Sequence, residues 1–247
     1  MKLSLFRIIN DEEKLIYFIK EIVERNLAIK KSSNKVEKYL LQRKKLFSLF
    51  DYGIQYNEEG LFSVTPESIA IHQAKRIKEA LRIIYPQKKE FKILDLCCGI
   101  GGNSIQFAIH GFRVISIDIN EEMCCLAKKN AEIYEVAEYI DFVHADFFVW
   151  ARELLKESRK TLDVPLFDAV FSSPPWGGPE YSSQEVFSLS NIFDGGQGYE
   201  RIEEFVDLSN QLSNGSFAFF LPKNTDFFEI VSSLKIDNVK PLLFVKN

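Results

Sequence analysis

The strongest constraint on the fold is a repeated order of apolar runs and helical stretches through the middle of the chain. The apolar runs cover residues 91–96, 112–118, 139–145 and 166–171. Segments with apolar residues at helical spacing follow the first three runs. Strands that alternate with helices predict a parallel sheet covered on both faces, and therefore a Rossmann-like α/β fold. In such a sheet the ligand crevice opens beyond the carboxyl ends of the strands.

Two further helical stretches, at about 11–28 and about 35–50, precede the first apolar run. They lie outside the strand–helix repeat, so they are not expected to cover the sheet. We therefore expect two parts, an N-terminal helical extension over 1–60 and an α/β domain over 61–247.

The boundaries of other elements follow from local signals. Turn residues occupy 57–60, and Thr65 as an N-cap with Pro66 at the first helical position predicts a helix that continues to about Ile84. The later elements are expected as helices over 199–212 and 226–234 and strands over 215–221 and 241–245.

The charge of the chain limits its partners. A formal net charge of −4 argues against a protein that coats duplex nucleic acid. From Lys30 to Lys45, however, there are seven basic residues and one acid, Glu37. Two interpretations stay open: a solvated helix face, or a local contact with the phosphates of a short nucleic-acid feature.

The remaining composition points to an intracellular protein without a metal. No apolar run approaches the roughly 20 residues that cross a bilayer, and the N-terminus has no signal-peptide core. The cysteines form two adjacent pairs, Cys97-Cys98 and Cys124-Cys125, without the C-x-x-C spacing of zinc sites. We expect reduced thiols and no membrane partner.

A glycine-rich turn follows the first apolar run, in the segment Asp95-Leu96-Cys97-Cys98-Gly99-Ile100-Gly101-Gly102-Asn103. Glycines at this place let the backbone pass close to a nucleotide-like ligand. Ser104 stands where a dinucleotide-binding turn has its third glycine, so binding of a pyrophosphate is disfavoured.

Acidic residues at three successive strand ends favour a different ligand. Asp95 suits a cationic amine, Asp118 can accept from both hydroxyls of a ribose, and Asp146 can accept from an adenine amino group beside Phe147. S-adenosylmethionine (AdoMet) carries all three groups. The sequence therefore predicts AdoMet as cofactor and methyl transfer as the chemistry.

The fourth apolar run leads into Ser172-Ser173-Pro174-Pro175-Trp176. The prolines end the strand and hold carbonyl groups without competing N–H donors, while Trp176 offers a face for stacking. Ser173 and the Pro174 carbonyl could orient the amino group of a planar substrate, aiming its nitrogen at the methyl carbon. The alternative from these residues alone is a proline turn with a buried tryptophan.

The glycine turn and the segment Ser173-Pro174-Pro175-Trp176-Gly177-Gly178-Pro179-Glu180-Tyr181 together resemble the trimethylguanosine synthase family of RNA cap guanine-N2 methyltransferases. The resemblance extends over roughly residues 35–230 and includes Lys38-Tyr39, Leu46-Phe47-Ser48, Phe62-Ser63-Val64-Thr65-Pro66-Glu67 and Phe220-Leu221-Pro222-Lys223-Asn224. It implies a class I AdoMet-dependent methyltransferase, with the N-terminal extension contributing to the cap and AdoMet site. It also implies methylation of N2 in the 7-methylguanosine caps of small nuclear and small nucleolar RNAs, giving 2,7-dimethyl and 2,2,7-trimethyl forms.

The resemblance also implies roles for individual residues. The catalytic residues are Ser173, Pro174 and Trp176. The cofactor-binding residues are Phe62, Ser63, Thr65, Asp95, Cys97, Gly99, Asn103, Asp118, Ile119, Asp146 and Phe147. The substrate-binding residues are Lys38, Phe47, Pro175, Trp176, Tyr181, Lys223 and Asn224. Because N7 methylation makes the guanine cationic, its stacking on Trp176 would gain a cation–π contribution. Two positions depart from the family, which usually has Arg in place of Lys223 and Trp in place of Leu40.

Two other functions stay open. One is methylation of adenine N6 or guanine N2 in DNA or ribosomal RNA, and the other is a cap-binding module of the same fold without catalysis. With the resemblance, we expect a monomer that binds m7G-capped RNA, in the nucleus (nucleolus or Cajal body), the cytoplasm or both.

Overall fold

The computed structural model describes residues 34–158, 165–175, 186–188, 198–213 and 215–226, with the side chains of 198–200 left aside. The chain divides into two compact units, Met1–Arg43 and Lys44–Asn247, and each is described by itself. Of the expected elements, the helix at 11–28, the helix at 226–234 and the strand at 241–245 lie outside the described residues. None of the helices in the described ranges is both long and apolar enough to cross a membrane.

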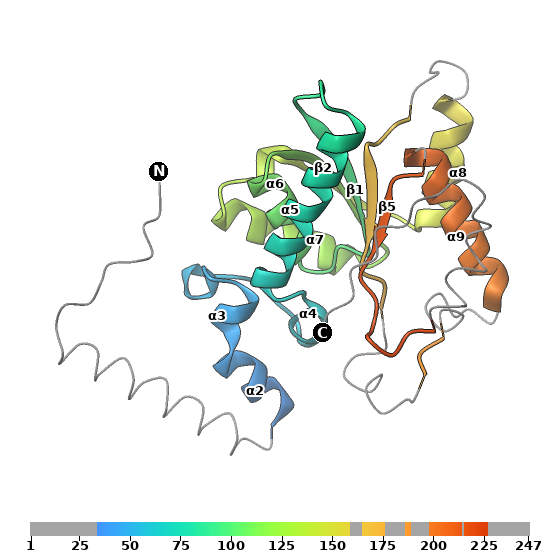
Figure 1. Cartoon of the computed structure of the whole chain (residues 1–247). Helices are drawn as coiled ribbons and strands as arrows, with labels where there is room; N and C mark the ends of the chain where they lie inside the picture. Colours follow the sequence, from blue (N-terminus) through green and yellow to red (C-terminus); the bar gives the residue numbers. More distant parts are fainter. Residues whose placement is uncertain (1–33, 159–164, 176–185, 189–197, 214, 227–247) are drawn as a thin grey trace. The chain divides into compact units, whose positions relative to one another are not determined.

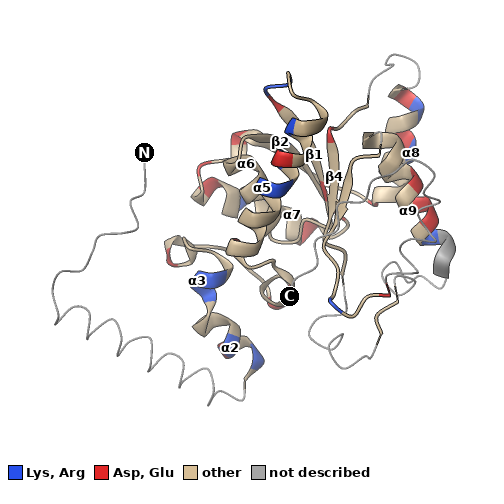
Figure 2. Ribbon diagram, viewed as in Figure 1, with Lys and Arg blue, Asp and Glu red and all other residues tan. Residues whose placement is uncertain are grey.

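In the first unit, helix α2 (Lys35–Leu41) begins at Asn34, whose side chain accepts a hydrogen bond from Val36 N at 2.9 Å. Such a cap satisfies one of the N–H groups that a helix leaves open at its start. Both α2 and the following helix α3 (Arg43–Leu46) contain lysine or arginine residues, coloured blue on the ribbon of Figure 2. Within the second unit, Lys44 forms an ion pair with Asp51 at 3.0 Å, so the charge of the Lys44 ammonium is partly neutralised.

The prediction of a single helix at about 35–50 is wrong. The chain forms α2, α3 and then a 3-10 turn, η1 (Phe50–Tyr52). The break between α2 and α3 falls at Gln42, whose N donates to Tyr39 O at 2.9 Å.

The end of α3 after Leu46 has a separate cause. Ser48 N donates to the Glu67 carboxylate, and Leu49 N donates to Tyr134 OH at 3.3 Å. These N–H groups are therefore bonded to side chains from distant helices instead of to helix carbonyls.

The turn expected at 57–60 opens a short helix, α4 (Glu58–Ser63), with the Asn57 side chain accepting from Gly60 N at 2.8 Å. Helix α5 (Glu67–Ile84) follows, and its end agrees with the prediction. Its N-cap is Pro66 instead of Thr65. Thr65 is buried, so its side chain packs inside the protein instead of capping the helix.

The strands of the second unit form one parallel sheet, which confirms the predicted fold class. They are β1 (Phe91–Leu96), β2 (Phe112–Asp118), β3 (Ile140–His144), β4 (Ala169–Ser172) and β5 (Phe217–Phe219). Among the described residues the strand order is β3-β2-β1-β4-β5, and every pairing is parallel. The chain order reverses between β1 and β4, where a crevice is expected beyond the carboxyl ends of the strands.

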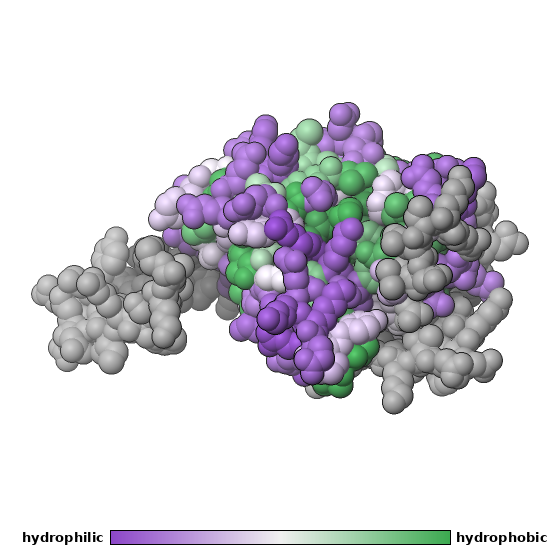
Figure 3. All heavy atoms as spheres, turned by 90° about the horizontal axis from the view of Figure 1, so that it is seen from above, coloured by the Kyte–Doolittle hydropathy of each residue, from purple (hydrophilic) through white to green (hydrophobic). Residues whose placement is uncertain are grey.

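Helices cover both faces of this sheet (Figure 1). Helices α5, α6 (Gly102–Ile109) and α7 (Glu121–Ile133) lie on one face, and α8 (Phe147–Ser158) and α9 (Gly198–Ser213) lie on the other. On the first face, Phe107 of α6 makes edge contacts with Phe112 and Phe171 at 5.8 and 5.1 Å between ring centroids. On the second, Phe148 and Phe205 join a buried cluster with strand residues such as Val170. Figure 3 shows mostly polar residues on the surface seen from above, with apolar residues near its middle.

Candidate active site

The glycine turn connects β1 to α6 with an unusual backbone. Cys97, Gly99 and Gly101 have φ angles of 60°, 53° and 91°, in the left-handed region that favours glycine. A Cβ added at Gly101 would lie 3.1 Å from Ala127 Cβ, so the turn passes tightly over α7. A Cβ added at Gly99 would meet no atom within 4 Å, which leaves open space for a ligand above that residue.

Asp118 ends β2 and holds this turn. Its Oδ2 accepts a hydrogen bond from Gly99 N at 2.8 Å, and its Oδ1 accepts from Asn120 N at 3.0 Å. The side chain is half-buried. Because each carboxylate oxygen has two lone pairs, both oxygens can also accept from the hydroxyls of a ribose. The fit to the predicted ligand is therefore good, although the turn already uses this carboxylate.

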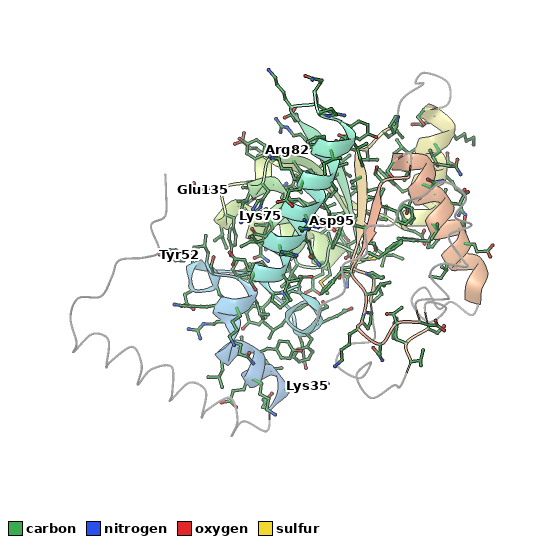
Figure 4. The ribbon with its side chains drawn as sticks, viewed as in Figure 1. Lys35, Tyr52, Lys75, Arg82, Asp95 and Glu135 are labelled. Carbon is green, nitrogen blue, oxygen red and sulfur yellow. The ribbon has the colours of Figure 1, made fainter. Side chains whose placement is uncertain are left out.

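Asp95 lies inside the α/β layer, among side chains of the sheet and of the helices that cover it (Figure 4), and is only 1% exposed. Ser104 Oγ donates to its Oδ2. Burial is the main reason that the pKa of Asp95 is raised to about 7; the hydrogen bond from Ser104 opposes the rise, and the negative charge of Asp118 adds to it. A neighbouring ammonium group would favour the ionised form. The buried acid thus fits the cationic amino group of AdoMet.

Asp146 has a structural role as well as the predicted one. It follows β3, and its Oδ1 accepts from Phe148 N at 2.8 Å and from Val149 N at 3.1 Å, which caps α8. No described residue hydrogen-bonds to Oδ2, which can still accept from an amino group. Beside it, the half-buried Phe147 ring packs on Phe205 at 5.1 Å between centroids. An open hollow of 510 Å³ continues from Asp146 along α8.

The predicted segment over 62–65 lies on the start of α6. A Cβ added at Gly102 would lie 2.6 Å from Val64 Cγ2 and 3.4 Å from Thr65 O. Phe62 is half-buried, while Ser63 is exposed and donates its hydroxyl to Glu59 O at 2.8 Å. The structure therefore brings this segment and the glycine turn together.

Asn103 and Cys97 take part in packing. Asn103 is buried, and its amide donates to Gln73 Oε1 of α5 at 2.7 Å. Burial, together with the charges of Asp118 and Asp95, raises the pKa of the Cys97 thiol to about 12. A thiol that stays protonated at neutral pH is a poor nucleophile. We therefore assign no covalent role to Cys97.

The diproline corner leaves the sheet next to the glycine turn, because Ser172 of β4 is paired in register with Leu96 of β1. Ser173 is half-buried, Pro174 is buried and Pro175 is exposed. Phe220 N donates to Ser172 O at 2.9 Å, so the chain after β5 leaves the sheet beside the corner.

The chain after β5 carries two predicted substrate residues. Lys223 is exposed and Asn224 is half-buried. Asn224 O accepts from Phe187 N at 2.8 Å, and Asp226 N donates to Phe187 O at 3.1 Å. These bonds anchor the segment after β5 to a part of the chain that follows the corner.

For the other predicted site residues, the structure gives no hydrogen bond to the glycine turn or the diproline corner among the described residues. Trp176 and Tyr181 lie outside the described residues, and Lys38 is exposed on α2 of the first unit. Phe47 is 2% exposed, and its ring lies 6.2 Å from that of Tyr134. Ile119 follows β2 and is 69% exposed, one of several exposed apolar side chains among the described residues.

Sequence reasoning did not assign three polar residues at this edge of the sheet. Ser104 was noted for the glycine it replaces, yet its hydroxyl bonds to Asp95. Ser172 is buried, and its hydroxyl has no partner at hydrogen-bond distance in the part of the chain that the structure describes, although it opposes the rise that burial causes in the pKa of the neighbouring Cys97 thiol. Asn130 is buried within α7. Their positions in the sequence were the signal that could have identified them. A polar residue on the apolar face of a helix or strand is buried, and buried polar groups are usually hydrogen-bonded.

The parallel sheet, the glycine turn and the acids at its edge are those of a class I AdoMet-dependent methyltransferase, and AdoMet is its methyl donor. Solved structures support the fold. An AdoMet-dependent methyltransferase of Agrobacterium tumefaciens superposes with a TM-score of 0.50 at 14% identity, covering 70% of this chain and 50% of that chain. A Porphyromonas gingivalis protein described as a methyltransferase gives 0.52 at 14% identity, covering 91% and 52%.

Sequence comparison defines the family. The model of the RNA cap guanine-N2 methyltransferase family matches residues 90–241, and this chain belongs to that family. Trimethylguanosine synthase of Schizosaccharomyces pombe is 35% identical over 215 residues, which cover 84% of this chain and 79% of that protein. Trimethylguanosine synthase of Saccharomyces cerevisiae is 34% identical over 199 residues, which cover 80% of this chain and 58% of that protein. The resemblance stated from the sequence is confirmed.

Proposed function

We propose that this chain methylates the exocyclic N2 of 7-methylguanosine caps on small nuclear and small nucleolar RNAs, first to the 2,7-dimethyl and then to the 2,2,7-trimethyl form. The family match supports guanine N2 as the acceptor, and the two yeast relatives are named for the trimethylated product. We further propose that the enzyme acts as a monomer, in the nucleus (nucleolus or Cajal body), the cytoplasm or both.

The observation that carries the proposal is the register between β4 and β1. Leu96, just before the glycine turn, is paired with Ser172, just before the diproline corner. Neighbouring strands lie about 4.8 Å apart. A cofactor bound at the turn and an amine held at the corner would therefore be neighbours, as an in-line transfer between them requires.

The cofactor supplies an electrophilic methyl group on a sulfonium, and the protein has to bind and orient it. Asp95 would pair with the ammonium, Asp118 would accept from the ribose hydroxyls, and Asp146 would accept from the adenine amino group through its Oδ2. Ile119 and Phe147 would contact the adenine ring. The segment over 62–65 would exclude water from the other side.

The substrate side requires an oriented and weakly nucleophilic nitrogen. Ser173 Oγ and the Pro174 carbonyl would accept hydrogen bonds from the N2 protons and direct the lone pair toward the methyl carbon. Trp176 would stack on the cationic 7-methylguanine. The other proposed cap contacts are Lys38, Pro175, Tyr181, Lys223 and Asn224. Phe47 is left out of this set, because its buried ring has little surface for a ligand.

Incubation with labelled AdoMet and, in separate reactions, m7GTP, GTP, DNA or ribosomal RNA tests the proposal. Label transferred to m7GTP and not to GTP supports cap N2 methylation after N7 methylation. Label transferred only to DNA or ribosomal RNA would point to another exocyclic amine, and binding of m7GTP without transfer would point to a cap-binding module. Mass spectrometry of the product separates one methyl from two.

A further inference from the structure

Helix α7 and its C-cap residue carry a row of three polar side chains, Glu122, Asn130 and Tyr134, at spacings of eight and four residues. Such spacings place them on one side of the helix. Each bonds to the segment 48–57. Glu122 Oε2 accepts from Asn57 Nδ2 at 2.7 Å, and Tyr134 OH accepts from Leu49 N at 3.3 Å. This face of α7 therefore fastens the stretch of chain that leads into α4.

Asn130 and Tyr134 each make three side-chain hydrogen bonds, and Asn130 is the more deeply buried of the two. It is fully buried, its Oδ1 accepts from Gln55 N at 2.7 Å, and its Nδ2 donates to Gln55 O at 2.9 Å. The same Nδ2 donates to Ile100 O, in the glycine turn, at 3.0 Å. If the Asn130 amide were turned over, its oxygen would face the carbonyl oxygens of Gln55 and Ile100. These hydrogen bonds therefore define the orientation of the amide. Of the three row residues, Asn130 alone bonds to both the segment and the turn.

The segment that Asn130 holds continues over the cofactor side of the turn. A Cβ added at Gly60 would collide with Ile100 Cγ2, and one added at Gly102 would lie 2.6 Å from Val64 Cγ2. Helix α4 and the residues after it therefore rest on the turn at two points. A shift of the chain at Gln55 would be passed to Phe62 and Thr65, because only a short helix separates them.

We propose that Asn130 is a positioning residue for AdoMet binding, which fixes the segment 54–65 against the glycine turn so that one wall of the cofactor site is formed before the cofactor arrives. This inference rests on the proposed roles of the 62–65 segment and Asp118. Asn130 would not touch the cofactor itself, because it is buried behind the turn. An apolar side chain in its place would leave the N–H and C=O of the exposed Gln55 and the C=O of the buried Ile100 without these partners. The Gln55 groups regain partners if the segment moves toward water.

The test compares two replacements of Asn130. Asn130→Leu keeps the approximate size and removes all three hydrogen bonds, while Asn130→Asp keeps the acceptor for Gln55 N and loses the donors to the carbonyls. We expect binding of S-adenosylhomocysteine to weaken about tenfold in Asn130→Leu, with a matching rise in KM for AdoMet and a smaller change in KM for m7GTP. Hydrogen exchange at residues 54–60 should speed up in the same variant, and the Gln55 amide should stay better protected in Asn130→Asp.

Two controls separate positioning from loss of stability. Gln55→Ala removes only a side chain that donates to Gly53 O, and the backbone groups that bond to Asn130 remain, so cofactor binding should be unchanged. Leu212→Ala opens a cavity in the buried cluster under α9, far from α7 in the fold, and should lower stability without changing cofactor affinity. If Leu212→Ala weakens cofactor binding as much as Asn130→Leu does, positioning by Asn130 is refuted.

The remaining outcomes are equally decisive. Unchanged cofactor affinity in a folded Asn130→Leu overturns the inference. If Asn130→Leu does not fold, Gly60→Ala tests whether the segment has to rest on the turn, because the added Cβ collides with the Ile100 side chain and leaves Asn130 untouched. An unchanged cofactor affinity in Gly60→Ala also overturns the inference. Asp118→Ala separates this question from the proposed site. If Asp118→Ala abolishes binding and the Asn130 variants do not weaken it, the site stands and the positioning role fails.

Discussion

Replacing Asp95 with asparagine should stabilise the cofactor-free protein and weaken its binding of AdoMet. Asp95 is buried, and burial raises the pKa of its carboxyl group from 3.8 to about 7. Asparagine has the same shape and never ionises, and its Oδ1 can still accept from Ser104 Oγ. The substitution therefore removes the cost of a buried charge and keeps the packing.

The sign of the pH dependence follows from proton binding. Between about pH 4 and pH 7 the folded protein keeps a proton on Asp95 that the unfolded chain has lost. The free energy of unfolding therefore falls as pH rises through this range and levels off above pH 7. A difference of about three pKa units corresponds to about 4 kcal/mol. Asp95→Asn should gain on the order of 4 kcal/mol over the unsubstituted protein at pH 8, and almost none at pH 4.

Cofactor binding should respond in the opposite way. The ammonium of AdoMet pairs with the ionised carboxylate, so below pH 7 binding has to expel a proton. Affinity in the unsubstituted protein should rise up to about tenfold per pH unit below pH 7 and then level off. In Asp95→Asn it should be weak and independent of pH. S-adenosylhomocysteine is the better probe, because it keeps the ammonium and lacks the sulfonium charge.

Urea denaturation at pH 5 and pH 8 without cofactor, together with calorimetry of S-adenosylhomocysteine at pH 6 and pH 8, measures both effects. Asp168→Asn is a matched control, because Asp168 is also buried but is paired with Lys88 at 2.6 Å and with Lys92 N at 2.8 Å. That control should lower stability and leave cofactor affinity unchanged. A variant Asp95→Asn that is less stable than the unsubstituted protein at pH 8 would refute the argument from burial.

Four further predictions concern the same site. Ser104→Ala removes the hydrogen bond that opposes the raised pKa of Asp95, so the pH midpoint of S-adenosylhomocysteine binding should move upward; an unmoved midpoint in calorimetry would contradict this. Trp176→Ala should abolish binding of m7GTP and spare that of S-adenosylhomocysteine, and cap affinity that survives in fluorescence titration would disprove the stacking role. Lys223→Arg should tighten binding of m7GTP more than of 7-methylguanosine, because a guanidinium binds phosphate in a bidentate way; equal changes would remove Lys223 from the triphosphate. Gly101→Ala should lower the unfolding free energy by about 1–2 kcal/mol in urea, because an alanine is strained at φ 91°, and an unchanged value would show that the turn can relax.

The fold was largely predictable because its central strands are continuous apolar runs in the sequence. The runs 91–96 and 112–118 match β1 and β2 to the residue, and the alternation with helices was enough for a parallel sheet. The helix expected at about 35–50 does not continue past Leu46, for a reason that no local pattern contains. Its N–H groups bond to Glu67 and Tyr134, which lie 19 and 85 residues further along the chain. Only tertiary structure brings these partners together.

The positions of the acidic residues in the candidate site were predictable, but the backbone groups that they bind were not. The positions of Asp95 and Asp118 at strand ends were clear from the sequence. That Asp118 also holds Gly99, or that Asp146 also caps α8, was not, because both roles depend on backbone N–H groups whose direction is set by the turn. Asn130 was the hardest to foresee, since a buried amide in a helix gives no sign of which segments it joins.

The glycine turn owes its shape to the elements that follow it. Asp118 accepts from Gly99 N, and Asn130 donates to Ile100 O, so the β2–α7 unit fixes two successive residues of the turn. Loss of cofactor binding in Asp118→Ala would therefore combine two effects, the missing bonds to the ribose and a displaced turn. Asp118→Asn helps to separate them, because its oxygen can still hold Gly99 N, while its amide group loses both the bond from Asn120 N and the ability to accept from a hydroxyl. The difference in affinity between the two variants then measures how much of the site is held by the turn and how much by the ribose contact.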